Sequence, residues 1–276
     1  MLDGVILLWF VLAALAVAFV AIDIRNTPES PVLKWGFVLL TAYTGVVGAF
    51  LYVLGCREPL RGAHEQYTAA RWRQTLGSTM HCVAGDGVGI LVGAVLSSLL
   101  GLTGLAEVAL EYVLGFGFGW TIFQALFMRD AAGGSYSAAL KRTFIPELLS
   151  MNLLMAGMVP TAMTLRRHVE LADDPTHARF WFVMSMALLV GFIIAYPMNW
   201  WLVANHLKHG MMTVRPKKDA DGTAMPMGSD GGMAMAGGGM AGMAMDGAQK
   251  SPPSVPTMSV LSFIALAAGL ALAFAG

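Results

Sequence analysis

The chain alternates long apolar stretches with short clusters of glycine, proline and charged residues. A membrane-spanning helix needs about 20 predominantly apolar residues, and seven stretches are long enough. They run approximately over residues 4–22, 35–54, 79–101, 106–128, 144–165, 180–204 and 257–275. The pattern predicts an all-α, polytopic transmembrane helical bundle of about seven spans, in which a six-helix bundle is followed by a linker and a C-terminal helix.

Two loops between these stretches differ in composition. Residues 59–76 mix arginine and His64 with tyrosine and tryptophan, which is typical of an interfacial helix against anionic headgroups or of a solvated connector. Residues 213–256 are rich in Gly, Ala, Met, Ser and Pro, so they cannot bury a core and are expected to be a flexible linker. The chain therefore divides into a transmembrane domain at 1–212, a linker at 213–256 and a C-terminal transmembrane helix at 257–276.

Composition supports a membrane protein and excludes several classes of soluble protein. Hydrophobic residues make up 57% of the 276 residues and charged residues only 12%, against about 25% charged residues in typical soluble domains. The formal net charge is zero, so no basic surface for nucleic acid is expected. The lipid bilayer is the expected partner, and a disordered chain or an ordinary cytosolic enzyme is excluded.

Lysine and arginine are unevenly distributed over the loops between the predicted spans. The loops after the second, fourth and sixth spans contain twelve of these residues, and the loops after the first, third and fifth contain five. Cytoplasmic loops of membrane proteins carry an excess of Lys and Arg, which predicts that the N-terminus and the long loop before the last span are cytoplasmic. The first span is preceded by Asp3 and no basic residue, unlike a secretory signal, so it is expected to remain as a helix in a bacterial inner membrane.

The third predicted span contains three polar side chains that are candidates for chemistry, His81, Cys82 and Asp86. Ionisable residues inside a membrane are costly and mark functional sites by default. Cys82 and Asp86 are four residues apart and lie on one helix face. Glycines at 85, 89 and 93 form a small-residue stripe beside them, which helix packing alone explains.

The fifth predicted span carries Glu147, Met151, Met155 and Met158 on one face. Thioethers fill irregular gaps in hydrophobic cores, so the methionine stripe is either packing or a set of soft metal ligands headed by a carboxylate. Pro146 is expected in the first turn of this helix, where its missing N–H has no cost.

If the spans alternate in direction, the polar groups of several helices fall in the same half of the membrane. Cys56, Asn152 and Asn199 then join the candidates as accessory residues. The predicted cytoplasmic half contains His81, Cys82, Asp86, Glu147, Met151, Asn152, Asn199 and Cys56. Alternation alone does not establish that these side chains touch.

The loop before the last span contains a tract of methionines. Its members are Met225, Met227, Met233, Met235, Met240, Met243 and Met245, and no histidine or cysteine follows Met212. Thioether ligands select Cu(I) or Ag(I) over zinc and Cu(II), whereas the alternative is a low-complexity segment without ligands. Upstream, His206, His209, Met211 and Met212 are placed to pass an ion between the tract and the sixth span. In a reducing cytoplasm thiols compete for Cu(I), so the tract is either a low-affinity transfer arm or lies on the other side.

Two runs carry a family resemblance. Residues 79–89 resemble the His-Cys-x-x-Gly signature of a bacterial integral-membrane family catalogued as a domain of unknown function. Residues 195–202 are similar to its Ala-x-Pro-x-Asn-x-Trp-Leu element, and residues 208–210 to a Lys-Gly-His-like element. Glu147 stands where this family tends to have a glutamate, whereas Asp86 replaces its usual second cysteine. The resemblance covers about 70–212 and implies a polytopic membrane protein and, by association, metal-related gene contexts.

Three functional hypotheses follow. The first is a membrane protein that binds and moves Cu(I), with His81, Cys82, Met151 and Met155 as ligands. Asp86 and Glu147 would accept protons or compensate charge, and metal-handling proteins would be its partners. The second is a proton-coupled permease for a small solute, in which the same two carboxylates are the relay. The third is a non-transporting subunit, in which the glycine stripe serves helix association, including that of a homo-oligomer. No hydrolase nucleophile motif or phosphate-binding glycine loop is found, so an enzyme is not predicted.

Overall fold

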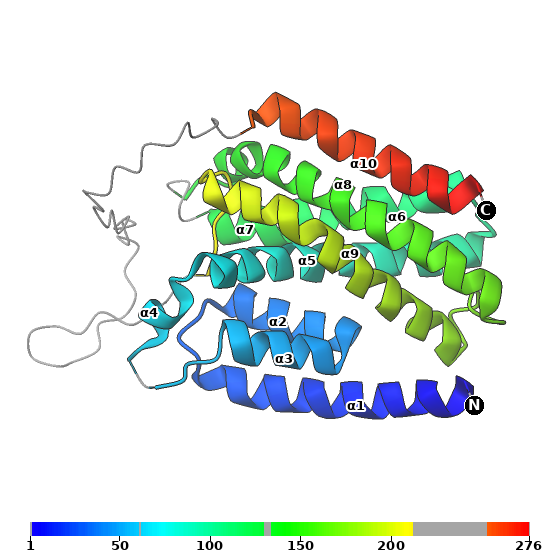
Figure 1. Ribbon diagram of the computed structural model, residues 1–276, viewed down its shortest axis with the longest axis horizontal. Coiled ribbons are helices and arrows are strands. Elements are labelled where there is room, and N and C mark those ends of the chain that lie inside the picture. The colour runs from blue at the N-terminus through cyan, green and yellow to red at the C-terminus, as the bar shows by residue number, and fades with distance from the viewer. Residues whose placement is uncertain (1, 61, 130–133, 212–252, 276) are drawn as a thin grey trace, which may run out of the picture.

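The computed structural model describes residues 2–60, 62–129, 134–211 and 253–275, and its elements there are all helices (Figure 1). Six described helical segments are long and apolar enough to cross a membrane. They are built on α1 (Leu2–Asp23), α5 (Arg71–Leu100), α6 (Leu105–Phe118), α8 (Tyr136–His168), α9 (Ala178–Ala204) and α10 (Val255–Ala275). The predicted all-helical, polytopic bundle is thereby confirmed.

The segment predicted as the second span forms two shorter helices instead of one. A 3₁₀ turn, η1 (Ile24–Asn26), leads to α2 (Pro31–Thr44), and α3 (Val46–Gly55) follows after Gly45. Gly45 has φ 58° and ψ −132°, a conformation that is accessible to glycine and strained for other residues. α3 then packs back against α2, because a Cβ on Gly48 would lie 2.7 Å from the Cα of Thr41. Hydropathy had indicated a single span because it measures apolar length and not chain direction.

This hairpin changes which ends of the chain lie together, because it enters and leaves at one end of the bundle (Figure 1). Arg179 at the start of α9 pairs with Asp3 at 2.9 Å, and Arg167 at the end of α8 donates to the carbonyl of Ala273 at 2.8 Å. The first and last described residues therefore share one end, whereas α9 ends and α10 begins at the other. Only α1 runs the length of the bundle before α5, so Leu2 and the end of α9 lie at opposite ends of the bundle, whereas a continuous second span would place them at the same end.

The fourth predicted span is interrupted near its middle. After α6, residues Gly119–Gln124 form a π-helical segment, η2, and Ala125–Met128 form the short α7. π segments interrupt α-helices mostly at functional sites. The fifth predicted span starts earlier than expected, at Tyr136, after Ser135 accepts a capping hydrogen bond from Ala138 N at 3.3 Å. Pro146 consequently lies inside α8 and not in its first turn.

Close helix packing explains the glycine stripe of α5. A Cβ on Gly89 would overlap the backbone of Leu114 in α6, and one on Gly93 would lie 2.8 Å from the Cα of Glu111. α10 packs in a similar way on α8, where Gly269 faces the backbone of Ala156. The stripe thus serves helix association, whereas large apolar side chains point outward. Examples are Leu7, Leu15, Ile22, Leu99 and Leu272.

Candidate functional site

The thiol of Cys82 lies in a buried polar cluster that joins four segments of the bundle. Cys82 comes from α5, Gln124 from η2, Glu147 from α8 and Lys208 from the segment after α9. The thiol donates to Glu147 Oε2 at 2.9 Å, and the Gln124 amide donates to the sulfur at 3.0 Å. The Lys208 ammonium donates to the sulfur and, at 3.0 Å, to Glu147 Oε2. All four side chains are buried, and we call them the thiol cluster.

Helix register accounts for the meeting of Cys82 and Glu147. α5 begins at Arg71 and α8 at Tyr136, so each side chain lies eleven residues after the start of its helix. At 1.5 Å per residue this is about 16 Å along each axis. Because both helices start at the same end of the bundle (Figure 1), the two residues reach the same depth.

Asp86 extends the polar region one helical turn beyond Cys82. A Cβ on Gly119 of η2 would overlap Asp86 Oδ1 and would lie 2.8 Å from Glu147 Oε1, so both carboxylates converge on this glycine. Asp86 and Glu147 are completely buried. Two carboxylates beside one ammonium leave a negative charge, and a buried charge is costly unless it is balanced. The site can therefore take up one further proton or monovalent cation without excess charge.

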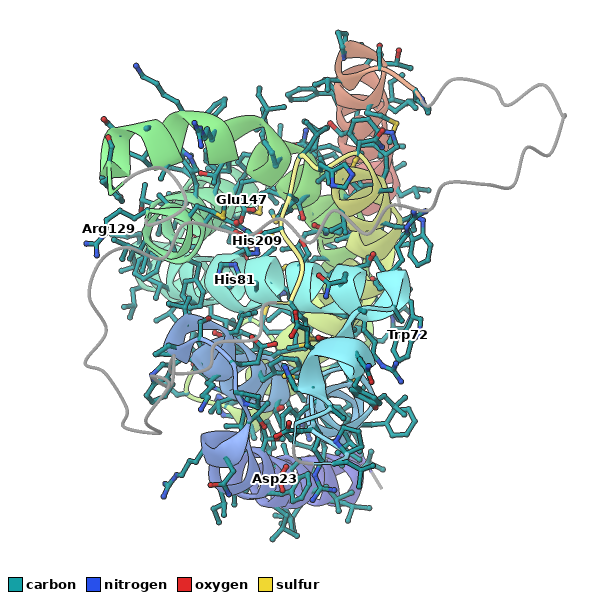
Figure 2. All side chains as sticks on the ribbon, turned by 90° about the vertical axis from the view of Figure 1, so that its left-hand side faces the viewer. Asp23, Trp72, His81, Arg129, Glu147 and His209 are labelled. Carbon is teal, nitrogen blue, oxygen red and sulfur yellow. The ribbon has the colours of Figure 1, made fainter. Side chains whose placement is uncertain are left out.

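Two histidines lie beside the thiol cluster, near the middle of the bundle when it is viewed from its end (Figure 2). The rings of His81 and His209 are 5.5 Å apart between centroids, and Phe123 of η2 lies 5.6 Å from His81. His209 follows α9 and has an imidazole that hydrogen-bonds the carbonyl of Gly210. Burial, reinforced by the nearby Lys208 charge, lowers the pKa of His209 to about 4, so the ring is neutral at pH 7.

Lys208 keeps its charge although it is buried. Burial acts to lower the pKa of Lys208, but Cys82 and Glu147 together outweigh this effect and hold the pKa above its ordinary value. The ammonium therefore lies between the thiol and the carboxylate and balances one negative charge there.

The predicted methionine ligands lie in the hydrophobic core. Met151 and Met155 are fully buried in one cluster of apolar side chains, together with Met158. The Met151 methyl group faces Gly115 of α6, one turn before Gly119. The Met151 thioether therefore lies beyond Glu147, toward the end of the bundle where α8 finishes.

The predicted accessory residues do not all join this site. Asn152 accepts from Tyr112 at 2.6 Å and donates to Ser262 of α10 at 3.0 Å, so it links three helices. Asn199 donates to Ser150 at 2.8 Å and joins α9 to α8. Met211 packs between Gly55 and Gly77, whereas His206 is exposed with φ 57°.

Cys56 belongs to a separate buried cluster at the end of the bundle where α5 begins. Its ligand atom and those of Glu29 and His64 all lie within 4.8 Å of one another. Burial, followed by the charge of Glu29, raises the pKa of the Cys56 thiol. Among the described residues, this N-terminal cluster of Glu29, Cys56 and His64 could hold a metal ion.

Several predicted site residues lie outside the part of the chain that the structure describes. The methionine tract, Met225, Met227, Met233, Met235, Met240, Met243 and Met245, lies outside the described residues, as does Met212. The linker expected at 213–256 overlaps α10, which begins at Val255.

Sequence reasoning missed Lys208, Gln124, Glu29 and His64 as site residues. Lys208 looked like one more basic loop residue, although it stands in the Lys-Gly-His-like element. Gln124 is the single amide in an apolar stretch, which is a signal of an intramembrane polar contact. Glu29 and His64 lie in connecting segments, where polar residues are common and carry no signal.

Comparison with known proteins places this site within a family. The family model described as Domain of unknown function (DUF4396) matches residues 71–208, half of the chain. The chain belongs to this family. No curated protein and no solved structure matches the sequence.

The DUF4396 region includes the whole thiol cluster, because Cys82, Gln124, Glu147 and Lys208 fall between its limits. The N-terminal cluster lies before the start of this region. The two clusters are therefore separate features of the chain, one within the family's domain and one outside it.

Proposed function

We propose that this DUF4396 protein binds a soft monovalent metal ion inside the membrane and moves it across, and that the ion is Cu(I). The observation that carries the proposal is the contact of the Cys82 sulfur with both Glu147 and the Lys208 ammonium. A thiol is the donor that Cu(I) prefers, and here it lies beside groups that can compensate charge.

Charge balance favours a monovalent ion. With Asp86 and Glu147 ionised and Lys208 charged, the site carries one net negative charge while Cys82 is a thiol. If Cu(I) binds the thiolate and the thiol proton passes to Asp86, the site becomes neutral. With the thiol proton kept on Asp86 in the same way, a divalent ion in this position would leave a positive charge in a low-dielectric interior, which is costly.

Soft donors continue on both sides of the thiol cluster. His81 and His209 lie toward the end where α9 finishes, and Met151 and Met155 lie deeper in the core. These donors are the candidates for a stepwise path through the bundle. In this proposal the methionine tract delivers or releases ions at the end where α9 finishes.

The test is anaerobic Cu(I) titration of the purified full-length protein in detergent, in competition with a chromophoric chelator. The wild-type protein is expected to bind Cu(I) with stoichiometry of about one, and Cys82→Ser to weaken binding at least about tenfold, because a thiolate ligand is lost. Cys56→Ser is the matched control, since it removes the other cysteine of the chain. Unchanged Cu(I) binding by Cys82→Ser would sink the intramembrane site.

A second candidate is a proton-coupled permease for a small solute. It is favoured by the convergence of Asp86 and Glu147 on Gly119, which provides adjacent groups for proton transfer. The permease hypothesis predicts a different result from the Cu(I) proposal. Asp86→Asn abolishes proton movement in proteoliposomes, whereas added copper and deletion of residues 225–245 leave transport unchanged.

The distribution of positive charge supports one orientation in a bacterial inner membrane. Among described residues, Arg166, Arg167 and Arg179 are the Lys and Arg residues at the end that holds both termini. Apart from Lys208, which is buried in the thiol cluster, the others belong to segments at the opposite end: Arg25, Lys34, Arg57, Arg71, Arg73, Arg129, Lys141 and Arg142. The excess of Lys and Arg marks the cytoplasmic side, so in this proposal the end of α9 and the start of α10 are cytoplasmic, and Leu2 and Ala275 lie on the outer side.

A further inference from the structure

The N-terminal cluster is formed by three side chains from three different segments. Glu29 lies between η1 and α2, Cys56 follows the last residue of α3, and His64 is the first residue of α4 (His64–Thr68). Cys56 and His64 are completely buried, and Glu29 is only 4% exposed. Carboxylates are rarely fully buried in folded proteins, and imidazoles are often only partly buried. Burial of both beside a thiol is therefore unusual.

The distances within the cluster suit a tetrahedral metal ion. All three ligand atoms lie within 4.8 Å of one another, and His64 Nε2 lies 3.6 Å from Glu29 Oε1. The latter distance is too long for a good hydrogen bond. Ligand atoms around zinc, at about 2.0–2.3 Å from the metal, are roughly 3.3–3.7 Å apart along the edges of a tetrahedron. Small side-chain movements therefore bring the three ligand atoms to three corners of a tetrahedron.

The donor set and its charge select the class of metal. A thiolate and a carboxylate carry two negative charges, and a neutral imidazole adds none, so a divalent ion gives a neutral site. Mixed S, N and O ligands suit Zn²⁺, whereas Ca²⁺ and Mg²⁺ require oxygen ligands. We infer that Glu29, Cys56 and His64 bind a divalent metal ion of the zinc class that ties the α2–α3 hairpin to α4.

Metal binding requires one proton to leave the site and another to change its position on the imidazole ring. The Cys56 thiol releases its proton to solvent as the Zn–S bond forms. His64 Nε2 hydrogen-bonds the carbonyl oxygen of Cys56 at 3.0 Å; on metal binding this hydrogen bond breaks, and the imidazole proton resides on Nδ1 so that the Nε2 lone pair faces the metal. No change of oxidation state occurs.

The site is independent of the proposed Cu(I) site. It uses different residues, lies before the DUF4396 region and favours a divalent ion, whereas the thiol cluster favours a monovalent one. Failure of one proposal consequently leaves the other intact, provided that the two cysteines are tested separately.

The experiment uses Co²⁺ as a spectroscopic probe for the zinc class, added to the full-length protein in detergent. Because the chain has two cysteines, a thiolate-to-cobalt charge-transfer band in Cys82→Ser has to come from Cys56. We expect this band in Cys82→Ser, its displacement by added Zn²⁺, and about one Zn²⁺ per chain by metal analysis. Absence of the band in Cys82→Ser overturns the inference without any change to the cluster itself.

The ligands are then tested singly in the Cys82→Ser background. Glu29→Gln and His64→Gln keep side-chain size and are expected to weaken Zn²⁺ binding at least about tenfold, as loss of a ligand does. Cys56→Ser is expected to abolish the charge-transfer band. Zn²⁺ stoichiometry and affinity that are unchanged in all three variants contradict the assignment.

Discussion

The side chains of the thiol cluster are individually costly to bury and become tolerable only together. Lys208 carries a positive charge in the bundle interior, where Glu147 and the Cys82 sulfur are its partners. Removing one member of a buried ion pair leaves the other uncompensated, whereas replacing both is often nearly neutral. The cluster therefore behaves as a unit in stability as well as in binding.

Lys208→Met is expected to destabilise the protein by about 3–5 kcal/mol, because Glu147 is left as an unpaired buried charge. The double variant Lys208→Met/Glu147→Gln is expected to recover most of this loss. Unfolding in detergent by heat or denaturant measures both. Equal destabilisation by the single and double variants would show that Lys208 contributes by packing and not by charge.

The lowered pKa of His209 predicts a pH dependence of stability. The folded protein keeps this ring neutral down to about pH 4, whereas the ordinary pKa in the unfolded chain is 6.5. The unfolded state therefore binds the proton more readily, so stability is present above pH 6.5 and is lost as pH falls toward 4.

Unfolding temperatures measured between pH 7.5 and 5 check this expectation. The wild-type protein is expected to lose more stability over this range than His209→Gln, which has no ring to protonate. Parallel pH profiles for the two proteins would contradict it.

At the scale of elements, the π segment η2 brings three residues to the site that a regular helix would distribute differently. Gly119 makes room for the carboxylates of Asp86 and Glu147, Phe123 contacts His81, and Gln124 binds the Cys82 sulfur. The extra residue per turn rotates the following side chains relative to those of α6. This interruption of the α-helix therefore directs the side chains of η2 toward α5 and α8.

Two glycines of the same stretch provide a matched comparison. Gly119→Ala is expected to destabilise the protein by about 1–3 kcal/mol, since its methyl group overlaps the Asp86 carboxylate. Gly117→Ala has nothing within 4 Å of the new methyl group and is expected to be neutral or stabilising by up to about 1 kcal/mol. Thermal unfolding and Cu(I) affinity are both measured, and similar behaviour of the two variants would contradict the role given to Gly119.

The whole molecule is organised by the α2–α3 hairpin, which enters the bundle and returns. Arg57 after α3 pairs with Asp23 at the end of α1 at 2.9 Å, so both ends of the hairpin region stay at the same end of the bundle. Because of this, all described Lys and Arg residues except Arg166, Arg167, Arg179 and the buried Lys208 belong to one end. The asymmetry of positive charge between the two ends is greater than the loop counts from the seven predicted spans indicated.

Reporter fusions test this topology. A reporter at either terminus is expected to report the periplasm, and one inserted between Met211 and Pro253 the cytoplasm. A continuous second span would instead place the N-terminus and the insertion on the same side. Agreement of the N-terminal fusion with the insertion would therefore contradict the hairpin.

Apolar length and residue identity determined the class of fold and much of the candidate chemistry. Both are local properties of the sequence, so they predicted the helices and placed Cys82 and Glu147 in the same half of the membrane. Contacts depend on chain direction and on distances between remote segments. Only the tertiary structure shows that the chain reverses at Gly45, that Lys208 contacts Cys82 and that Cys56 lies in a separate cluster.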